Sequence, residues 1–158
     1  MTMAAIVTDP LTGIMLSVFR VNARLLEKGD ELVAPLQLTS ARWQVLGAIA
    51  LADGPLTAPQ IATAMGVTRQ GVQKQLNLAM QEGWIQPDEN PRHERSPLYA
   101  LTRAGRRVYD AAMTLEQNWS EALSVGLDAG ELAVALRVLK ALEERLAATP
   151  LPVRGRRA

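Results

Sequence analysis

Hydrophobic residues near the N-terminus of the chain follow a helical repeat. Asp9 and Pro10 form a strong helix start, and apolar positions recur from there to about Val33. They form two neighbouring rows, one of Ile14, Val18, Val21 and Leu25 and one of Leu11, Met15 and Phe19. Because such a helix is apolar on more than one side, we expect it to need partners on more than one side.

Three later stretches repeat this spacing. A second helix is predicted after Thr39, with Trp43, Leu46, Ile49 and Ala50 at core positions, and a long helix is predicted from Thr102, with Val108, Ala112, Leu115, Trp119 and Ala122. Asp128 and Glu131 cap a last helix, whose leucine row is Leu132, Leu136, Leu139, Leu142 and Leu146. This row can pack within one chain, but together with the first helix it favours a symmetric dimer.

The middle of the chain predicts two short helices joined by a tight turn. Thr57 and Gln60 form a capping box that starts the first of them. Gly66 can adopt the positive φ that ends this helix, and Thr68 is a good N-cap for the next one, which we expect to run to about Gly83.

The second of these helices has two distinct sides. Its apolar side holds Val72, Leu76, Ala79 and Gly83, and its polar side holds Arg69, Gln70, Gln73, Lys74 and Asn77. Such polar side chains can hydrogen-bond to base edges and phosphates. A solvated surface helix would show the same pattern, so the helix alone does not decide between the two.

A hairpin directly after this helix favours nucleic-acid binding. Trp84 and Ile85 are predicted as one strand and residues 98–101 as its return, with PDENPRHERSP between them. Two helices, a turn and an arginine-tipped wing are the order of a winged helix-turn-helix. The residues predicted to contact DNA are Thr68, Arg69, Gln70, Gln73, Lys74, Asn77, Arg92 and Arg95.

The chain resembles the MarR family of bacterial transcription regulators from roughly Leu11 to Ala147. The most specific element is the wing followed by an LT-x-x-G turn, here Leu101, Thr102 and Gly105. The resemblance implies that Arg95 enters the minor groove. His93 stands where the family commonly has an acidic residue that supports this arginine, so the wing is expected to be held differently.

The expected fold is mainly α, a winged helix-turn-helix with N- and C-terminal helices forming a dimerisation lobe. A single MarR-like domain would span residues 1–158. Residues 38–105 would form the DNA-binding lobe, residues 10–35 and 106–148 the dimerisation lobe, and residues 149–158 a disordered basic tail. In a homodimer, two recognition helices about one DNA turn apart would match a pseudo-palindromic operator in double-stranded DNA. The resemblance also implies a repressor more than an activator.

Composition narrows these expectations. The 158 residues are 48% hydrophobic, enough for one domain with its own core. A net charge of +1 and a pI near 8.2 are low for a nucleic-acid binder, whose pI usually exceeds about 9, but residues 69–107 are locally basic. The alternative is a winged-helix protein-interaction module, which would more often show an apolar patch where Gln73 and Lys74 stand.

Other classes of protein are disfavoured. The chain has no cysteine and one histidine, His93, so we expect no metal site, no cofactor and no enzyme. No apolar run is long enough for a membrane span and no leader pattern is present, so a cytoplasmic protein without a membrane partner is expected.

A small-molecule effector is a further expectation, since the resemblance implies one that is often aromatic. We expect a cleft near the start of the second helix, which would suit an aromatic carboxylate or phenol. Its predicted lining is Met15, Phe19, Arg42, Trp43, Tyr109 and Met113, although core packing alone would explain Phe19, Trp43 and Met113. Sequence does not name the operator, the regulated genes or the effector.

Overall fold

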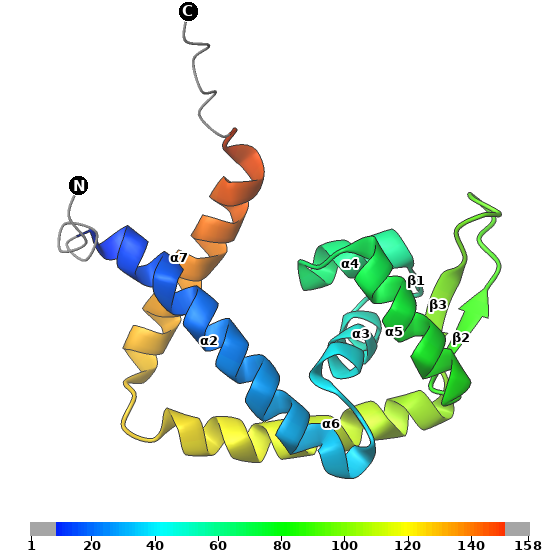
Figure 1. The fold of residues 1–158 in the computed structure, drawn as a ribbon, viewed down its shortest axis with the longest axis horizontal. Helices are drawn as coiled ribbons and strands as arrows, with labels where there is room; N and C mark the ends of the chain where they lie inside the picture. Colours follow the sequence, from blue (N-terminus) through cyan, green and yellow to red (C-terminus); the bar gives the residue numbers. More distant parts are fainter. Residues whose placement is uncertain (1–8, 151–158) are drawn as a thin grey trace, which may run out of the picture. The chain divides into compact units, whose positions relative to one another are not determined.

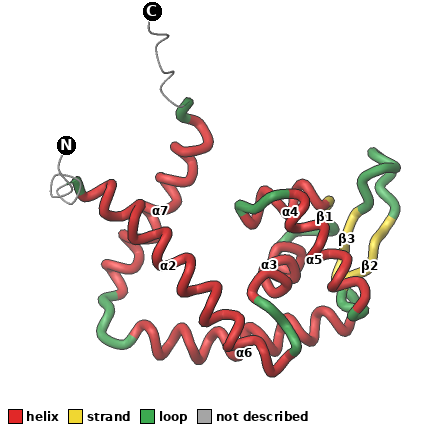
Figure 2. The backbone as a smooth tube through the Cα atoms, viewed as in Figure 1, coloured by secondary structure: helices red, strands yellow, loops and turns green. Residues whose placement is uncertain are grey.

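The structure is a computed structural model that describes residues 9–150. Helices make up most of this part of the chain, and the strands are confined to one small sheet (Figures 1 and 2). The elements in chain order are α2 (Pro10–Val33), the 3-10 helix η1 (Ala34–Leu36), α3 (Ser40–Ala50), β1 (Leu56–Thr57), α4 (Ala58–Met65), α5 (Arg69–Gln81), β2 (Ile85–Asp88), β3 (Leu98–Leu101), α6 (Arg103–Ser124) and α7 (Ala129–Ala148). The expected mainly α winged-helix fold is confirmed. Most of the expected basic tail, residues 151–158, lies outside the described residues.

Side-chain caps start the helices where the sequence predicts them. The carboxylate of Asp9 accepts from the backbone of Leu11 and Thr12, and Asp128 accepts from the backbone of Glu131. Thr57 and Gln60 form the complete capping box at the start of α4. Each of these side chains satisfies backbone N–H groups that have no partner within the helix, which is why they set its first residue.

The end of α5 differs from the prediction. The helix stops at Gln81, with Glu82 as its C-cap, and does not reach Gly83. Gly83 has a φ of 72°, a left-handed conformation that glycine adopts without a Cβ clash. The chain therefore turns at Gly83 directly into Trp84 and β2.

The sheet is antiparallel with the order β1-β3-β2. The β2–β3 hairpin is the predicted wing, and β2 extends to Asp88, which pairs with Leu98. The strand β1 was not predicted. Its two residues pair Leu56 with Tyr99 and Thr57 with Leu98, so β3 is the middle strand.

A single hydrophobic core joins α3, α4, α5 and the sheet with the end of α2 and the first half of α6. Its largest fully buried side chains are Leu46, Ile61, Leu76, Val33, Val45 and Val72. The chain divides into two compact units, residues 1–118 and 119–158, and the boundary falls within α6. The lobe boundaries expected from sequence stay a prediction.

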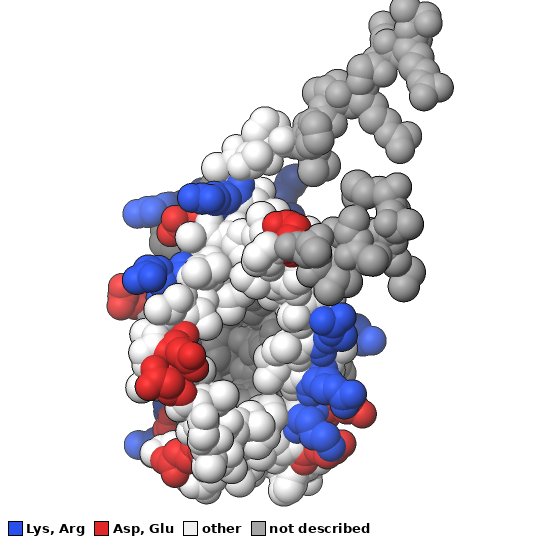
Figure 3. All heavy atoms as spheres, turned by 90° about the vertical axis from the view of Figure 1, so that its left-hand side faces the viewer, with Lys and Arg blue, Asp and Glu red and all other residues white. Residues whose placement is uncertain are grey.

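Large apolar side chains are exposed on the terminal helices. On α2 they are Leu11, Met15, Leu16, Val18, Phe19, Val21, Leu25 and Leu26, and on α7 they are Leu132, Val134, Leu136, Leu139 and Leu146. In Figure 3, residues other than Lys, Arg, Asp and Glu, drawn white, cover broad areas of the viewed face. Between residues 9 and 150, no helix combines the length and the apolar character that a membrane crossing needs.

Candidate nucleic-acid interface

The turn between α4 and α5 sets the position of α5. Gly66 ends α4 with a φ of 64°, and the backbone N–H of Val67 donates to the carbonyl of Ala62 at 3.1 Å. Thr68 then caps α5, its hydroxyl accepting from Gly71 N at 3.1 Å. One side of α5 is buried in the core through Val72, Leu76 and Ala79, so the opposite side faces solvent.

The predicted recognition residues lie on this free side. The side chains of Arg69, Gln70, Lys74 and Asn77 are exposed, whereas Gln73 is half-buried. Thr68 is exposed, but its hydroxyl is already used as the cap of α5. The free side of α5 therefore carries polar side chains that can reach a ligand, and Leu78 is the exposed apolar side chain among them.

Gln73 is held by a contact that the sequence did not indicate. Its Nε2 donates to Asn77 Oδ1 at 3.1 Å and to the hydroxyl of Tyr99 at 3.3 Å. Asn77 lies one turn further along α5, a normal spacing for a side-chain pair on a helix. Tyr99 lies 26 residues further along the chain, on β3. The folding of the sheet against α5 brings its hydroxyl to Gln73.

The wing is organised by Asn90. Its Nδ2 donates to the carbonyl of Ser96 at 2.8 Å, and its Oδ1 accepts from Arg92 N at 3.1 Å. The carbonyl of Asn90 also accepts from His93 N at 3.0 Å, and that of His93 from Ser96 N at 2.9 Å. These bonds close the loop without an acidic residue at position 93.

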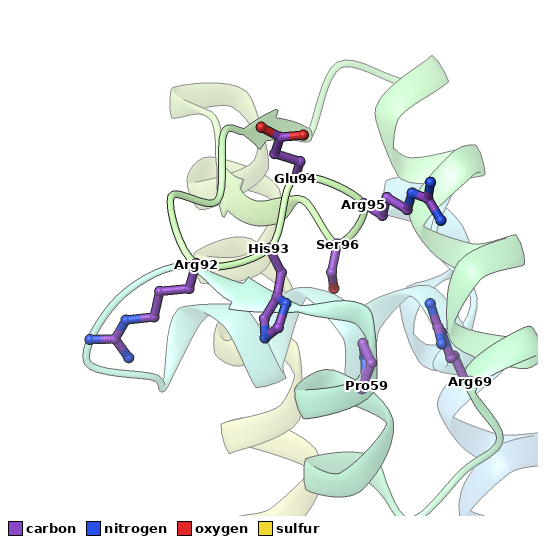
Figure 4. A pocket seen from close by; sticks show the side chains of 7 residues that line it. All are labelled: Pro59, Arg69, Arg92, His93, Glu94, Arg95 and Ser96. Carbon is purple, nitrogen blue, oxygen red and sulfur yellow. The ribbon is translucent and has the colours of Figure 1, made fainter.

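A basic hollow lies between the wing and the start of α5. It has a volume of about 580 Å³ and is lined by Pro59, Arg69, Arg92, His93, Glu94, Arg95 and Ser96. Arg69 and Arg95 lie on one side of it, Arg92 extends from the other, and Glu94 points away from the remaining labelled side chains (Figure 4). Three guanidinium groups around an open hollow favour an anion, and a DNA phosphate is the form that a duplex presents beside its grooves.

The LT-x-x-G turn ties the wing to the end of α5. The hydroxyl of Thr102 donates to the carbonyl of Gly83 at 2.6 Å and accepts from Gly105 N at 3.0 Å. The backbone N–H of Thr102 donates to the carbonyl of Trp84 at 3.0 Å. A Cβ on Gly105 would collide with the carbonyl group of Trp84. Glycine is therefore required where this turn crosses the backbone.

The residues predicted to bind an effector have separate surroundings. The guanidinium of Arg42 lies 5.7 Å from the ring centroid of Trp84, and its Nε donates to the hydroxyl of Thr39 at 3.4 Å. Tyr109 is buried, and burial raises the pKa of its phenol above the usual value. Trp43 and Met113 are partly buried against the core, while Met15 and Phe19 are exposed on α2.

Neither the basic hollow nor a second surface pocket is lined by these six side chains. The second pocket, of about 370 Å³, is lined by Ile49, Ala52, Gly54, Pro55, Ala100, Leu101, Thr102, Arg103 and Arg106. The effector site therefore stays a prediction. Within residues 9–150, no group of three or more His, Cys, Asp or Glu side chains is arranged to hold a metal ion.

Comparisons with known proteins find relatives in sequence and in fold. The profile of the MarR family matches residues 36–96, which run from the end of η1 into the wing. An uncharacterized protein of Mycobacterium tuberculosis, Rv2011c, is 39% identical over 104 residues, which are 66% of this chain and 71% of that protein.

Solved structures share the fold over most of the chain. The MarR family transcription regulator SP03579 matches with a TM-score of 0.75 and 25% identity over 89% of this chain and 93% of that one. A mutant of Escherichia coli MarR complexed with operator DNA matches with a TM-score of 0.68 and 24% identity, over 85% and 99%. CouR from Rhodococcus jostii, bound to p-coumaroyl-CoA, matches with a TM-score of 0.70 and 19% identity, over 92% and 96%.

Proposed function

The chain belongs to the MarR family of DNA-binding transcription regulators, and from this premise we propose that it is a repressor that binds a pseudo-palindromic operator as a homodimer. The observation that carries the proposal is the free side of α5 beside the basic hollow. Exposed polar side chains on a helix next to an arginine-rich wing are what a winged-helix reader needs for base edges and phosphates.

Each part of the interface has a proposed task. Gln73 and Lys74 lie one turn into α5 and would face base edges in the major groove. Arg69 and Arg92 would contact phosphates, and Arg95 would lie over the adjacent minor groove. The E. coli MarR mutant complexed with operator DNA supports this arrangement through its shared fold.

The homodimer is proposed from the apolar surface of the terminal helices. Phe19 is 71% exposed and Leu146 is 70% exposed within one chain, and neighbouring apolar side chains are exposed on both helices. Apolar surface exposed along a helix in this way marks an interaction site, and a two-fold axis would cover it on both copies at once. The same axis would place two copies of α5 on one operator.

The proposal is tested by selecting DNA with the purified full chain from fragmented genomic DNA at moderate salt. We expect enriched sites to contain inverted repeats whose half-sites are about 10 base pairs apart or a multiple of that. A reporter placed behind an enriched promoter should lose expression when the protein is supplied. Absence of any enriched motif would contradict sequence-specific binding, and a gain of expression would contradict repression.

Arg95→Ala should weaken binding to every sequence. A contact between the wing arginine and the DNA backbone or minor groove is largely electrostatic, so its loss should reduce the slope of log K against log salt by about one. Fluorescence anisotropy over a salt series measures this slope. Arg20→Ala, which removes an exposed arginine of α2, is the matched control and should leave it unchanged. An unaltered slope in Arg95→Ala would remove the wing from the proposed interface.

An aromatic acid is proposed as the effector, and salicylate is the probe. We expect salicylate to raise the melting temperature, because it would bind the folded protein. We also expect it to weaken operator binding, because a ligand that prefers the conformation that does not bind DNA shifts the protein toward that conformation. The rise in melting temperature and the loss of operator binding should both be smaller in Arg42→Ala, which removes the cation of the predicted site. Both should persist in Arg137→Ala, the control, which removes an exposed arginine of α7. Stabilisation without any change in operator affinity would show a binding site that does not regulate DNA binding.

A further inference from the structure

Tyr99 brings a buried hydroxyl to the recognition helix. The residue is 4% exposed, and its hydroxyl accepts from Gln73 Nε2 at 3.3 Å while Asn77 Oδ1 accepts from the same nitrogen at 3.1 Å. A primary amide has two N–H donors and one carbonyl oxygen. Both donors of Gln73 are therefore used inside the protein, and Oε1 is the atom left for a ligand.

We propose that Tyr99 is a positioning residue for base readout, which holds the Gln73 amide so that Oε1 faces the major groove as an acceptor. In that groove, adenine and cytosine present amino donors, while guanine and thymine present oxygen acceptors. Gln73 then accepts one hydrogen bond from adenine N6 or cytosine N4. This inference rests on the proposed function, because it needs α5 in the major groove of a specific site.

The sheet makes Tyr99 a rigid support. Tyr99 is on the middle strand, and its backbone lies opposite Leu56 on one side and Pro87 on the other. Its ring is buried in the same core as Val72 and Leu76 of α5. The position of the hydroxyl is therefore fixed before DNA binds, which lowers the entropy lost when Gln73 meets a base.

The contact also excludes another form of readout. A bidentate contact between a glutamine and adenine uses the amide nitrogen as a donor to N7 and the amide oxygen as an acceptor from N6. While Tyr99 and Asn77 occupy both hydrogens of Gln73 Nε2, only the oxygen is available. We therefore expect adenine and cytosine to be accepted at the Gln73 position, and guanine and thymine to be rejected.

The test compares base preferences in selections from randomised duplexes by the full-length protein and its variants. Gln73→Ala identifies the operator position read by Gln73, because the preference there should disappear. Tyr99→Phe removes one oxygen and should reduce discrimination at that same position by about 3- to 10-fold, the value of one neutral hydrogen bond. Other positions, the salt slope and the melting temperature should stay close to those of the parent protein. Thr114→Val removes a side-chain hydroxyl on α6 that donates to the carbonyl of Asp110, and it is the control, which should change none of the preferences.

A double variant separates positioning from a structural role. Because Tyr99 acts through Gln73, Tyr99→Phe should have no further effect on that position in the Gln73→Ala background. Equal loss at all positions, or a preference for guanine or thymine at the Gln73 position, would overturn the inference. Full discrimination in Tyr99→Phe, or no flattened position in Gln73→Ala, would also overturn it while leaving the proposed function intact. A parent protein that selects no motif would defeat both.

Discussion

Gly105→Ala is expected to lower the free energy of unfolding by about 3 kcal/mol, the upper part of the range for forcing an extra carbon into a packed site. The new Cβ would collide with the carbonyl group of Trp84, whose carbon lies 2.8 Å from the Cβ position. The backbone of Trp84 has little freedom to move, because it is hydrogen-bonded on both sides. Its N–H donates to the carbonyl of Ala79 at the end of α5, and its carbonyl accepts from the N–H of Thr102 at the start of α6.

Chemical denaturation of the parent and variant at equal protein concentration measures this loss, since any dimerisation makes the apparent stability depend on concentration. Gly47→Ala is the matched control. Its Cβ would meet Tyr109 at an ordinary contact distance of 3.5 Å, and the residue lies inside α3, where alanine is favoured over glycine. We expect this control to keep or slightly raise the stability. A Gly105→Ala protein as stable as the parent would show that the crossing backbones can separate freely.

Local signals in the sequence were sufficient to predict the helix starts and the wing. Each cap depends on residues three positions apart, such as Asp128 with Glu131, so the information is contained within one turn. The apolar side of α5 was also readable, because a period of 3.6 places Val72, Leu76 and Ala79 together. The same logic located the free side of the helix that carries the proposed DNA contacts.

Contacts between segments distant in sequence could not be predicted in this way. Strand β1 has only two residues, and no alternating pattern can be recognised at that length. The bond from Gln73 to Tyr99 depends on the register of β3 beneath α5, which no local pattern specifies. Tyr99 could be recognised only as a strand residue until the fold brought its hydroxyl to the recognition helix.

The contacts that hold the wing could not be read from the family resemblance. The resemblance indicated only that position 93 holds a histidine where the family commonly has an acidic residue that supports the wing arginine. It did not indicate that Asn90, three residues earlier, would hold the loop through the carbonyl of Ser96 and the backbone of Arg92. Asparagine does this in turns because its short amide reaches backbone groups two or more residues away.

Combined replacement of Leu139 and Leu142 by glutamate is expected to convert the proposed dimer into monomers or aggregates. Leu139 is 43% exposed on α7, and it belongs to a row in which Leu136 is 55% exposed within one chain. If a second copy covers this row, each new carboxylate would be buried without a partner, which is strongly unfavourable. Analytical ultracentrifugation over a range of protein concentrations measures the assembly state directly.

Operator binding should fall with assembly, because two linked half-site contacts bind more tightly than one by about 100-fold or more. A control variant, Arg137→Glu, changes the net charge by the same two units at an exposed position of α7 on the other side of the helix from the leucine row. It should remain dimeric and keep its operator affinity, which separates the loss of an apolar contact from the effect of the changed charge. A parent protein that sediments as a monomer, or an intact dimer in the leucine variant, would contradict the proposed interface. In either case the exposed leucines of α7 would need a different partner, and the pairing of two recognition helices on one operator would need a different axis.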